Sequence, residues 1–380
     1  MKKNNSIPIL YYHSVANHDK KRPWSFLSCD IQTFTNQMKY LYQNGYTTCN
    51  WDELYEHLQG IKQLPKKTVM IQFDDGFLDN WVVVFPIMKK YNFKFTVVVT
   101  PEFIESHPVR TFTNQTSAED LDKWWGYLSK EELKEMEASG LVDIQAHGFS
   151  HTWYPMSDKI IDIYDGTQIE PWLYWNENIQ NKPHWLTNDS LKKIPLGYPI
   201  FRNEKSLSNL RAYKPNKEFV QACIDSYDIS KDKEENLVTI NKLRYRYQAQ
   251  DKLGSYETDE EAMNRLKKEL LGTREYLENI LDKKVEYLVW PGGGNNAKVQ
   301  QLAFDCGYKL ISKGTELNSF NSKLTKISRV AAYHEFRPRF LNSWLNVLFL
   351  QLQIWRAEGN KFVDNIIKII KQIKKGLANL

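Results

Sequence analysis

Two pairs of residues have the types and the spacing that metal-dependent hydrolysis requires. Asp74 and Asp75 directly follow the apolar run Thr68–Phe73, and His147 and His151 form a His-x-x-x-His pair directly after another apolar run. Two imidazoles at this spacing and one carboxylate suit Zn²⁺ and similar divalent metals, and an open coordination position would hold a nucleophilic water. Successive residues leaving a strand point in different directions, so the second carboxylate can face this water as a base. An ordinary Asp-Asp-Gly turn and a structural pair of histidines are the alternatives.

A glycine-rich run supplies a third candidate element. Pro291, Gly292 and Gly293 follow the apolar segment 285–290. Glycines let backbone N–H groups approach a ligand closely, and such groups can form an oxyanion hole. A phosphate-binding loop is the alternative, but the run matches neither Gly-x-x-x-x-Gly-Lys-Ser/Thr nor Gly-x-Gly-x-x-Gly.

Two other classes of hydrolase are disfavoured by the same residues. The histidine pair is not part of the His-Glu-x-x-His pattern of metalloproteases. A glycosidase needs two carboxylates that face each other across the scissile bond. Asp74 and Asp75 are neighbours at one strand end and cannot flank a bond in that way.

All three motifs follow predicted strands, and helices are predicted between these strands. This alternation indicates a parallel α/β sheet, open or closed, whose carboxyl edge gathers the motifs into one site. The predicted strands are 7–12, 68–73, 93–100, 141–146, 285–290 and 308–312, and the predicted helices are 34–44, 52–58, 81–91, 129–140, 259–281 and 297–306.

The regular pattern is lost from about residue 154 to 256, which we interpret as a long irregular insertion near the site. The insertion is rich in tryptophan. Trp172, Trp175 and Trp185 could form a wall on which sugar rings stack. An aromatic core that holds the insertion together is the alternative.

Composition excludes several classes of protein. With 42% hydrophobic and 26% charged residues the chain is globular, and a net charge of +5 over 380 residues is too weak to indicate nucleic-acid binding. The four cysteines form no Cys-x-x-Cys pair, which argues against a thiolate metal site and for a reducing compartment. We find no signal peptide and no run of the ~20 apolar residues that a membrane span needs, and we therefore expect a cytoplasmic protein.

In combination and order, these motifs resemble a known family, the polysaccharide deacetylases of the NodB-homology type, also called carbohydrate esterase family 4. The run 73–76, Phe-Asp-Asp-Gly, resembles the first motif of the family, and 146–151, Ala-His-Gly-Phe-Ser-His, resembles its second, with Ala146 where serine is usual. Trp290-Pro291-Gly292-Gly293 is similar to the third-motif loop of the poly-N-acetylglucosamine deacetylase subgroup. Residues 8–13 resemble the opening strand of the same subgroup. The resemblance covers about residues 7–155 and 260–335.

The resemblance implies a distorted (β/α)7 barrel over residues 1–340, interrupted by the insertion at about 154–256. It implies Asp74 as the general base and Asp75, His147 and His151 as ligands of a divalent metal, with Zn²⁺ the first choice. A backbone N–H near Gly292 would help to hold the oxyanion. The implied reaction removes the acetyl group from an N-acetylated amino sugar by hydrolysis.

Two departures from the family pattern concern the catalytic residues. The third-motif arginine that pairs with the base carboxylate is absent, and Arg329 is the candidate replacement, with a barrel-end ion pair as the alternative. The usual Leu-x-His of the general acid is also missing, which leaves His334 and His13 as candidates. These departures keep a second hypothesis open, a carbohydrate-binding relative that has lost catalysis.

The segment 341–380 is predicted as an amphipathic helical extension. Apolar residues recur at helical spacing beside five lysines, so the helix either lies on an anionic membrane face or packs on the barrel. The resemblance implies a carbohydrate substrate, which is either a cell-surface polysaccharide or a lipid-linked precursor such as a lipopolysaccharide intermediate. The membrane alternative for the helix implies peripheral contact with the inner face of the cytoplasmic membrane through 361–380. The apolar residues are Phe362, Ile366, Ile370, Ile373 and Leu377, and the lysines are Lys361, Lys368, Lys371, Lys374 and Lys375.

Overall fold

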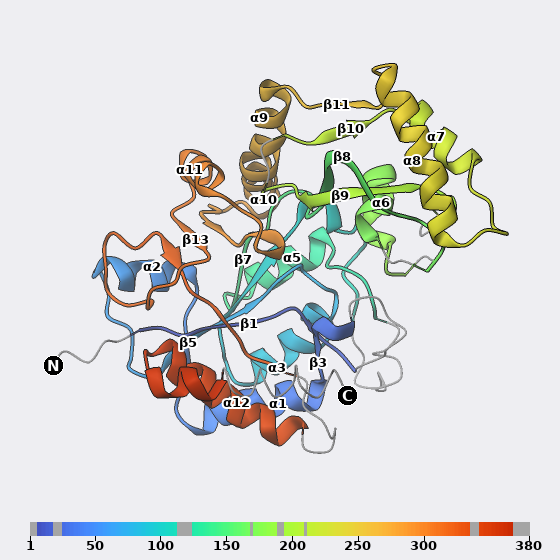
Figure 1. The fold of residues 1–380 in the computed structure, drawn as a ribbon. Coiled ribbons are helices and arrows are strands. Elements are labelled where there is room, and N and C mark those ends of the chain that lie inside the picture. The colour runs from blue at the N-terminus through green and yellow to red at the C-terminus, as the bar shows by residue number, and fades with distance from the viewer. Residues whose placement is uncertain are drawn as a thin grey trace. The chain divides into compact units, whose positions relative to one another are not determined.

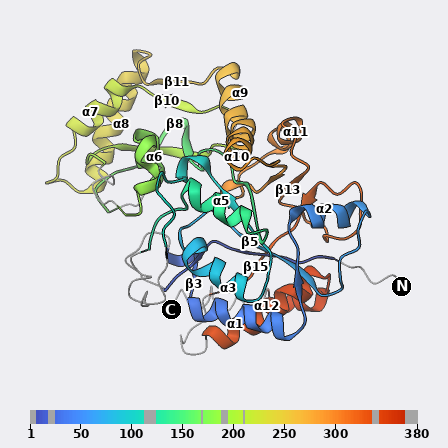
Figure 2. The same ribbon diagram turned by 180° about the vertical axis from the view of Figure 1, so that it is seen from behind.

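The computed structural model describes residues 6–17, 25–111, 124–167, 170–187, 194–208, 211–334 and 342–367 (Figures 1 and 2). The chain forms two compact units. The first comprises residues 1–147, 276–289 and 308–380, and the second comprises 148–275 and 290–307.

The first unit contains a curled, nine-stranded sheet whose pairings are all parallel. Its strands follow the order β14-β13-β12-β7-β6-β5-β1-β15, and β4 pairs with β5. The sheet and its helices confirm the predicted barrel-like α/β class, in the form of a partial barrel. The strands are β1 Ile9–Tyr12, β4 Thr47–Thr48, β5 Thr68–Phe73, β6 Phe95–Val99, β7 Val142–Ala146, β12 Tyr287–Leu288, β13 Leu310–Ser312, β14 Lys326–Ile327 and β15 Val330–Ala331.

Three helices of this unit begin at residues whose side chains cap them. Asp30 accepts a hydrogen bond from the N–H of Thr33, and Asn50 and Ser129 each form a reciprocal capping box with the glutamate three residues later. Glycine at 60 takes the left-handed conformation that ends α2. The helices are α1 Ile31–Gln43, α2 Trp51–Gln59, the π-helical turn η2 Asn80–Val84 with α3 Phe85–Lys90, α5 Lys130–Ala138 and α12 Asn342–Ala357, and α10 Thr273–Leu281 leads into the unit from the second.

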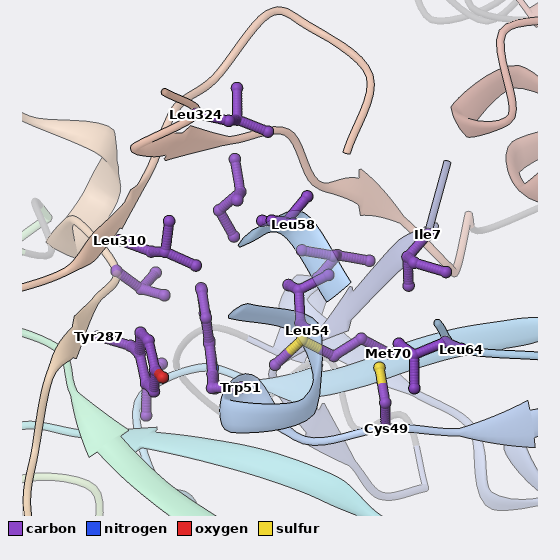
Figure 3. Close-up of a cluster of buried hydrophobic side chains, with 14 residues drawn as sticks. Ile7, Cys49, Trp51, Leu54, Leu58, Leu64, Met70, Tyr287, Leu310 and Leu324 are labelled. Carbon is purple, nitrogen blue, oxygen red and sulfur yellow. The ribbon is translucent and has the colours of Figure 1, made fainter. Parts of the chain in front are cut away.

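A buried apolar cluster fixes α2 against the sheet (Figure 3). Trp51 of α2 stacks on Tyr287 of β12 with 5.0 Å between ring centroids and 12° between their planes. Leu54 and Leu58 of the same helix are buried in the cluster with Met70 of β5. This packing anchors two of the strands that carry the motifs, because β5 ends immediately before Asp74 and β12 leads to Pro291.

The second unit corrects the prediction of an irregular insertion. It contains an antiparallel pair, β8 Trp153–Ile163 and β9 Pro199–Lys205, and a helix α8, Lys233–Ala249, of 17 residues. The ladder between β8 and β9 shifts register twice, which breaks the alternation that marks a strand in sequence. Only Asn236 and Ile240 are buried along α8, so no apolar stripe marks it either. The other elements are α6 Pro171–Glu177, β10 Tyr213–Pro215, α7 Lys217–Asp225, β11 Gly254–Tyr256, α9 Asp259–Lys267, the π-helical turn η6 Lys268–Gly272, the short turn η7 Pro291–Gly293 and α11 Ala297–Asp305.

The start of the predicted extension packs on the first unit. Helix α12 lies along α1, and Gln37 of α1 donates to the carbonyl of Asn346 at 3.1 Å. The chain is helical again over 361–367, where Val363 and Ile367 are buried. The later residues of the predicted stripe, Ile370, Ile373 and Leu377, lie outside the described residues, as do Lys368, Lys371, Lys374 and Lys375. Within the part of the chain that the structure describes, no helix is long and apolar enough to cross a membrane.

Candidate active site

Asp74 forms a buried ion pair with Arg329. One guanidinium nitrogen donates to both carboxylate oxygens, at 2.8 and 3.0 Å, and Gln72 donates to one of them at 2.7 Å. The ring of His13 lies 3.9 Å from the second oxygen. Arg329 therefore lies beside Asp74, as predicted from the sequence. It comes from the segment just before β15 and not from the third motif.

The charges around Asp74 favour its ionised form. Burial raises the pKa of Asp74, but the charges of Arg329, His147 and His13 outweigh burial and hold this pKa below its usual value. The guanidinium of Arg329 also lies over the ring of Tyr11, 4.8 Å from its centroid. Asp74 is thus a fixed carboxylate, deprotonated at neutral pH, which is the state that a general base needs.

Asp75 and His147 face each other at the carboxyl ends of β5 and β7. The distance from the Asp75 carboxylate to Nε2 of His147 is 3.2 Å. Nδ1 of His147 lies 2.9 Å from the carbonyl of Val289, which can only accept, so Nδ1 carries a proton. Nε2 is therefore the ring nitrogen through which His147 can bind a metal.

His151 completes a set of potential metal ligands. One ligand atom each from Asp75, His147 and His151 can be chosen so that all three lie within 4.8 Å of one another. Asp75 and His151 both have positive φ, 75° and 50°, a conformation that is uncommon for residues other than glycine and that recurs at functional sites. Two imidazoles and one carboxylate suit a divalent metal such as Zn²⁺, so the residues fit the group that the resemblance implies.

The glycine of the first motif is required by packing. Gly76 has φ +72°, and a Cβ at this position would lie 2.8 Å from Cγ1 of Val99 in β6. A larger residue would push the Asp-Asp turn away from the neighbouring strand. The motif therefore needs both the two carboxylates and a residue without a side chain.

A buried glutamate that the sequence did not reveal holds the turn leading to His151. Glu269 accepts hydrogen bonds from the N–H groups of Phe149 and Ser150 at 3.0 and 3.1 Å, and from the hydroxyl of Ser150. The ammonium of Lys182 donates to the carbonyl of Ser150. Glu269 lies in the π-helical turn η6, an irregularity that often marks functional positions but that has no sequence signature.

We predict that Glu269→Ala weakens metal binding, because the turn that presents His151 loses three hydrogen bonds. The expected loss in metal affinity is about 10- to 100-fold, typical of residues that orient a metal ligand. Glu269→Gln keeps an oxygen for the two N–H groups and should retain most of the affinity. Isothermal titration of Zn²⁺ into each metal-stripped variant measures the difference. Equal affinities for Glu269→Ala and the wild type would mean that Glu269 only stabilises the second unit.

The glycine loop of the third motif lies next to the turn of the second. A Cβ on Gly148 would lie 3.1 Å from Cγ of Pro291. The N–H groups of Gly293 and Gly294 donate within the loop, to the carbonyls of Trp290 and Pro291 at 3.0 and 3.1 Å. Gly292, with φ +54°, is therefore the remaining candidate among the predicted oxyanion donors.

The glycines of this loop also accommodate Lys205 of β9. A Cβ on Gly292 would lie 2.9 Å from Cε of Lys205, and one on Gly294 would lie 2.6 Å from its Cδ. The ammonium of Lys205 lies over the ring of Trp153, 4.9 Å from its centroid. The glycines were predicted to let the backbone approach a ligand closely. In the structure the aliphatic part of the Lys205 side chain also packs against Gly292 and Gly294.

Two of the three tryptophans proposed as a sugar-stacking wall are buried. Trp175 and Trp185 are each 1% exposed and pack edge to face, with 5.4 Å between ring centroids. Burial leaves them no open face for a sugar, so these two fit the aromatic core that was the alternative. Trp172 is partly exposed and stacks on Trp153 with 5.1 Å between centroids, and it remains a candidate for substrate contact.

The two candidate general acids differ in position. His13 lies beside Asp74, as described above. The ring of His334 stacks on Phe349 of α12 with 5.6 Å between centroids, and the backbone of His334 exchanges hydrogen bonds with the side chain of Asn346. The geometry therefore favours His13 as the acid and gives His334 a packing role.

Comparison with known proteins agrees with these motifs. Residues 61–187 match the family model for polysaccharide deacetylase. The Bacillus subtilis protein YxkH, named as a polysaccharide deacetylase, is 30% identical over 38% of this chain and 43% of its own length. The poly-beta-1,6-N-acetyl-D-glucosamine N-deacetylase of Escherichia coli K12 is 24% identical over 40% of this chain and 21% of its own length. The enzyme of the same name from Staphylococcus aureus MRSA252 is 26% identical over 54% of this chain and 75% of its own length. The chain thus spans less than half the length of the first two of these relatives.

Solved structures support the fold. A de-N-acetylase from Aggregatibacter actinomycetemcomitans has a TM-score of 0.52 at 16% identity, with 89% of this chain and 99% of that chain covered. The BpsB deacetylase domain from Bordetella bronchiseptica has the same TM-score at 17% identity, with 87% and 97% covered. At these identities the two structures show the fold alone. The match to the family model identifies a polysaccharide deacetylase domain in residues 61–187.

Proposed function

We propose that the protein is a metal-dependent N-deacetylase that acts on N-acetylated amino sugars of a cell-surface polysaccharide or its precursor. The observation that carries the proposal is the buried pair of Asp74 and Arg329 directly beside the ligand set of Asp75, His147 and His151. The names of the Escherichia coli and Staphylococcus aureus relatives suggest β-1,6-linked N-acetylglucosamine as the first substrate to try.

Each residue has a role in the proposed hydrolysis. When bound, a divalent metal supplies a Lewis acid and lowers the pKa of water. Asp74 takes the proton as the water oxygen attacks the amide carbonyl, while Arg329 keeps Asp74 ionised and oriented. The N–H of Gly292 donates to the carbonyl oxygen as negative charge develops there. His13 donates a proton to the leaving nitrogen as the C–N bond breaks, which yields acetate and the free amine.

The substrate assignment is tested by mass spectrometry of β-1,6-linked N-acetylglucosamine oligomers after incubation with the metal-loaded protein. We expect products that have lost acetyl groups one at a time. If no acetyl group is lost although the protein holds metal, another N-acetylated sugar is the substrate, or the chain is a binding relative that has lost catalysis. The absent third-motif arginine favours that alternative, and the placement of Arg329 on Asp74 opposes it.

We also propose that the substrate is lipid-linked and that the protein works at the inner face of the cytoplasmic membrane. The support is the basic C-terminal segment, whose residues 361–380 contain five lysines and one acidic residue. Lysines near an anionic bilayer each contribute about 1 kcal/mol of attraction. A lipid-linked N-acetylglucosamine presented in vesicles should then be deacetylated faster than the same sugar in solution.

We predict that Arg329→Ala shifts the acidic limb of the pH profile of kcat/KM upward. Arg329 is the strongest of the groups that lower the pKa of Asp74 against the effect of burial, so its removal raises this pKa. The base is then lost by protonation at a higher pH than in the wild type. Arg329→Lys keeps the positive charge and should give a smaller shift. An acidic limb that does not move in Arg329→Ala would leave Arg329 a purely structural role.

A further inference from the structure

Helix α12 leaves several large apolar side chains exposed. Trp344, Leu348 and Trp355 are 61%, 40% and 40% exposed, and their spacing places them along one side of the helix. Phe362, in the helical segment that follows, is 73% exposed. We call these four side chains the α12 face. Single exposed apolar residues are normal on a protein surface, but a row that includes two tryptophans indicates a binding surface.

The opposite side of α12 is firmly attached to the first unit. Phe349, Leu350 and Ile354 are buried, and α12 packs along α1. Asn36 of α1 donates to the hydroxyl of Ser343 at 2.7 Å, which adds a polar contact to this packing. The α12 face is therefore held outward on a fixed helix.

Positive charge is concentrated in the segment that carries the α12 face. Residues 337–380 contain eight lysines and arginines and two acidic residues, whereas residues 1–336 contain 43 basic and 44 acidic residues. The whole positive surplus of the chain thus belongs to this segment. Helix α12 itself, Asn342–Ala357, has no acidic residue. Arg356 pairs with Asp364 at 2.8 Å, which neutralises one charge of each sign.

We infer that the α12 face binds the surface of an anionic phospholipid bilayer. Indole rings favour the boundary between lipid and water, and apolar burial combined with basic residues is the usual requirement for peripheral binding. A second copy of the chain is a poorer occupant, because two strongly basic segments would then face each other. The inference deepens the proposed membrane location and rests on it, but it does not depend on the deacetylation chemistry.

The residues that the structure favours for membrane contact differ from those that the sequence pattern favoured. The sequence pattern pointed to a stripe that begins at Phe362 and Ile366, and the buried residues of that segment are Val363 and Ile367. This part of the helix therefore already uses a face for packing. The exposed tryptophans of α12, which the sequence pattern did not separate from their buried neighbours, become the residues that enter the lipid.

The test is co-sedimentation of the full chain with vesicles of phosphatidylcholine alone and of phosphatidylcholine mixed with phosphatidylglycerol. We expect binding to the anionic vesicles, weakened by high salt because charge attraction is screened. The triple variant Trp344→Ser, Trp355→Ser, Phe362→Ser should bind roughly tenfold more weakly or worse, because three apolar side chains no longer enter the lipid. Ile229→Ser, which changes a side chain in the second unit that is 81% exposed, is the matched control and should bind like the wild type.

Three results would overturn the inference. The first is a wild-type chain that stays in the supernatant with anionic vesicles. The second is an equal loss of binding in the triple variant and the Ile229→Ser control. The third is a wild-type dimer in sedimentation velocity that the triple variant converts to a monomer, which would make the α12 face a protein interface. Acetate release from a soluble oligomer should be the same for the triple variant and the wild type, so failure here is distinguishable from failure of the proposed reaction.

Discussion

Asp74→Asn should retain the metal and lose most of the deacetylase activity. Asparagine has nearly the same shape as aspartate, but it cannot accept the proton of the attacking water. General base catalysis contributes about 10²- to 10⁴-fold, so kcat should fall by that factor. Asp74 is not in the ligand set of Asp75, His147 and His151, and the metal content should therefore stay at the wild-type level.

The measurement pairs kcat with metal analysis of the same preparation. Asp30→Asn is a matched control in the same unit, since Asp30 caps α1 and asparagine is an equally good cap. Thermal melting checks that both variants fold. Full activity in Asp74→Asn would show that another group takes the proton and would remove Asp74 from the mechanism.

Replacing any one of the three ligands should abolish metal binding and, with it, the activity. We expect Asp75→Ala, His147→Ala and His151→Ala each to lose more than about 100-fold in metal affinity, since changes to residues that merely orient a ligand already cost 10- to 100-fold. His184→Ala removes an exposed histidine of the second unit and should leave the affinity unchanged.

Because Asp75 has φ +75°, alanine at this position also strains the turn. Asp75→Asn tolerates the left-handed conformation better and isolates the loss of the carboxylate charge. Metal is measured by elemental analysis after dialysis. Stoichiometric metal in all of the ligand variants would mean that the ion binds elsewhere and that the proposed site is incorrect.

The strands that carry the motifs were the most predictable part of the fold. The predicted strand 68–73 is β5, residue for residue, because its side chains are all buried and give an unbroken apolar run between turn residues. The predicted helix start at Ser129 held for a related reason, since a capping box acts locally. The helices predicted from 34 and 52 begin at Ile31 and Trp51, after the caps Asp30 and Asn50. Arg329 was proposed as the partner of Asp74 because the third-motif arginine of the family is missing, and the structure places the two side chains 2.8 Å apart.

The remaining features depend on contacts between distant residues. Glu269 supports the turn before His151 from 119 residues away, and neither its type nor its spacing shows this in the sequence. The burial of Trp175 and Trp185 depends on how α6 packs within its unit, so a sugar-binding wall and an aromatic core have the same sequence signature. The regular elements within residues 154–256 were missed because mixed burial along β8 and α8 removes the periodicity by which strands and helices are recognised.

The most direct test of the central claim is acetate release from β-1,6-linked N-acetylglucosamine oligomers by wild-type protein before and after removal of its metal. The account predicts that release stops when the metal is stripped and returns when divalent metal is added back in about equal amount to the chain, while Asp75→Asn does not recover. Undiminished acetate release from the stripped protein would contradict the account.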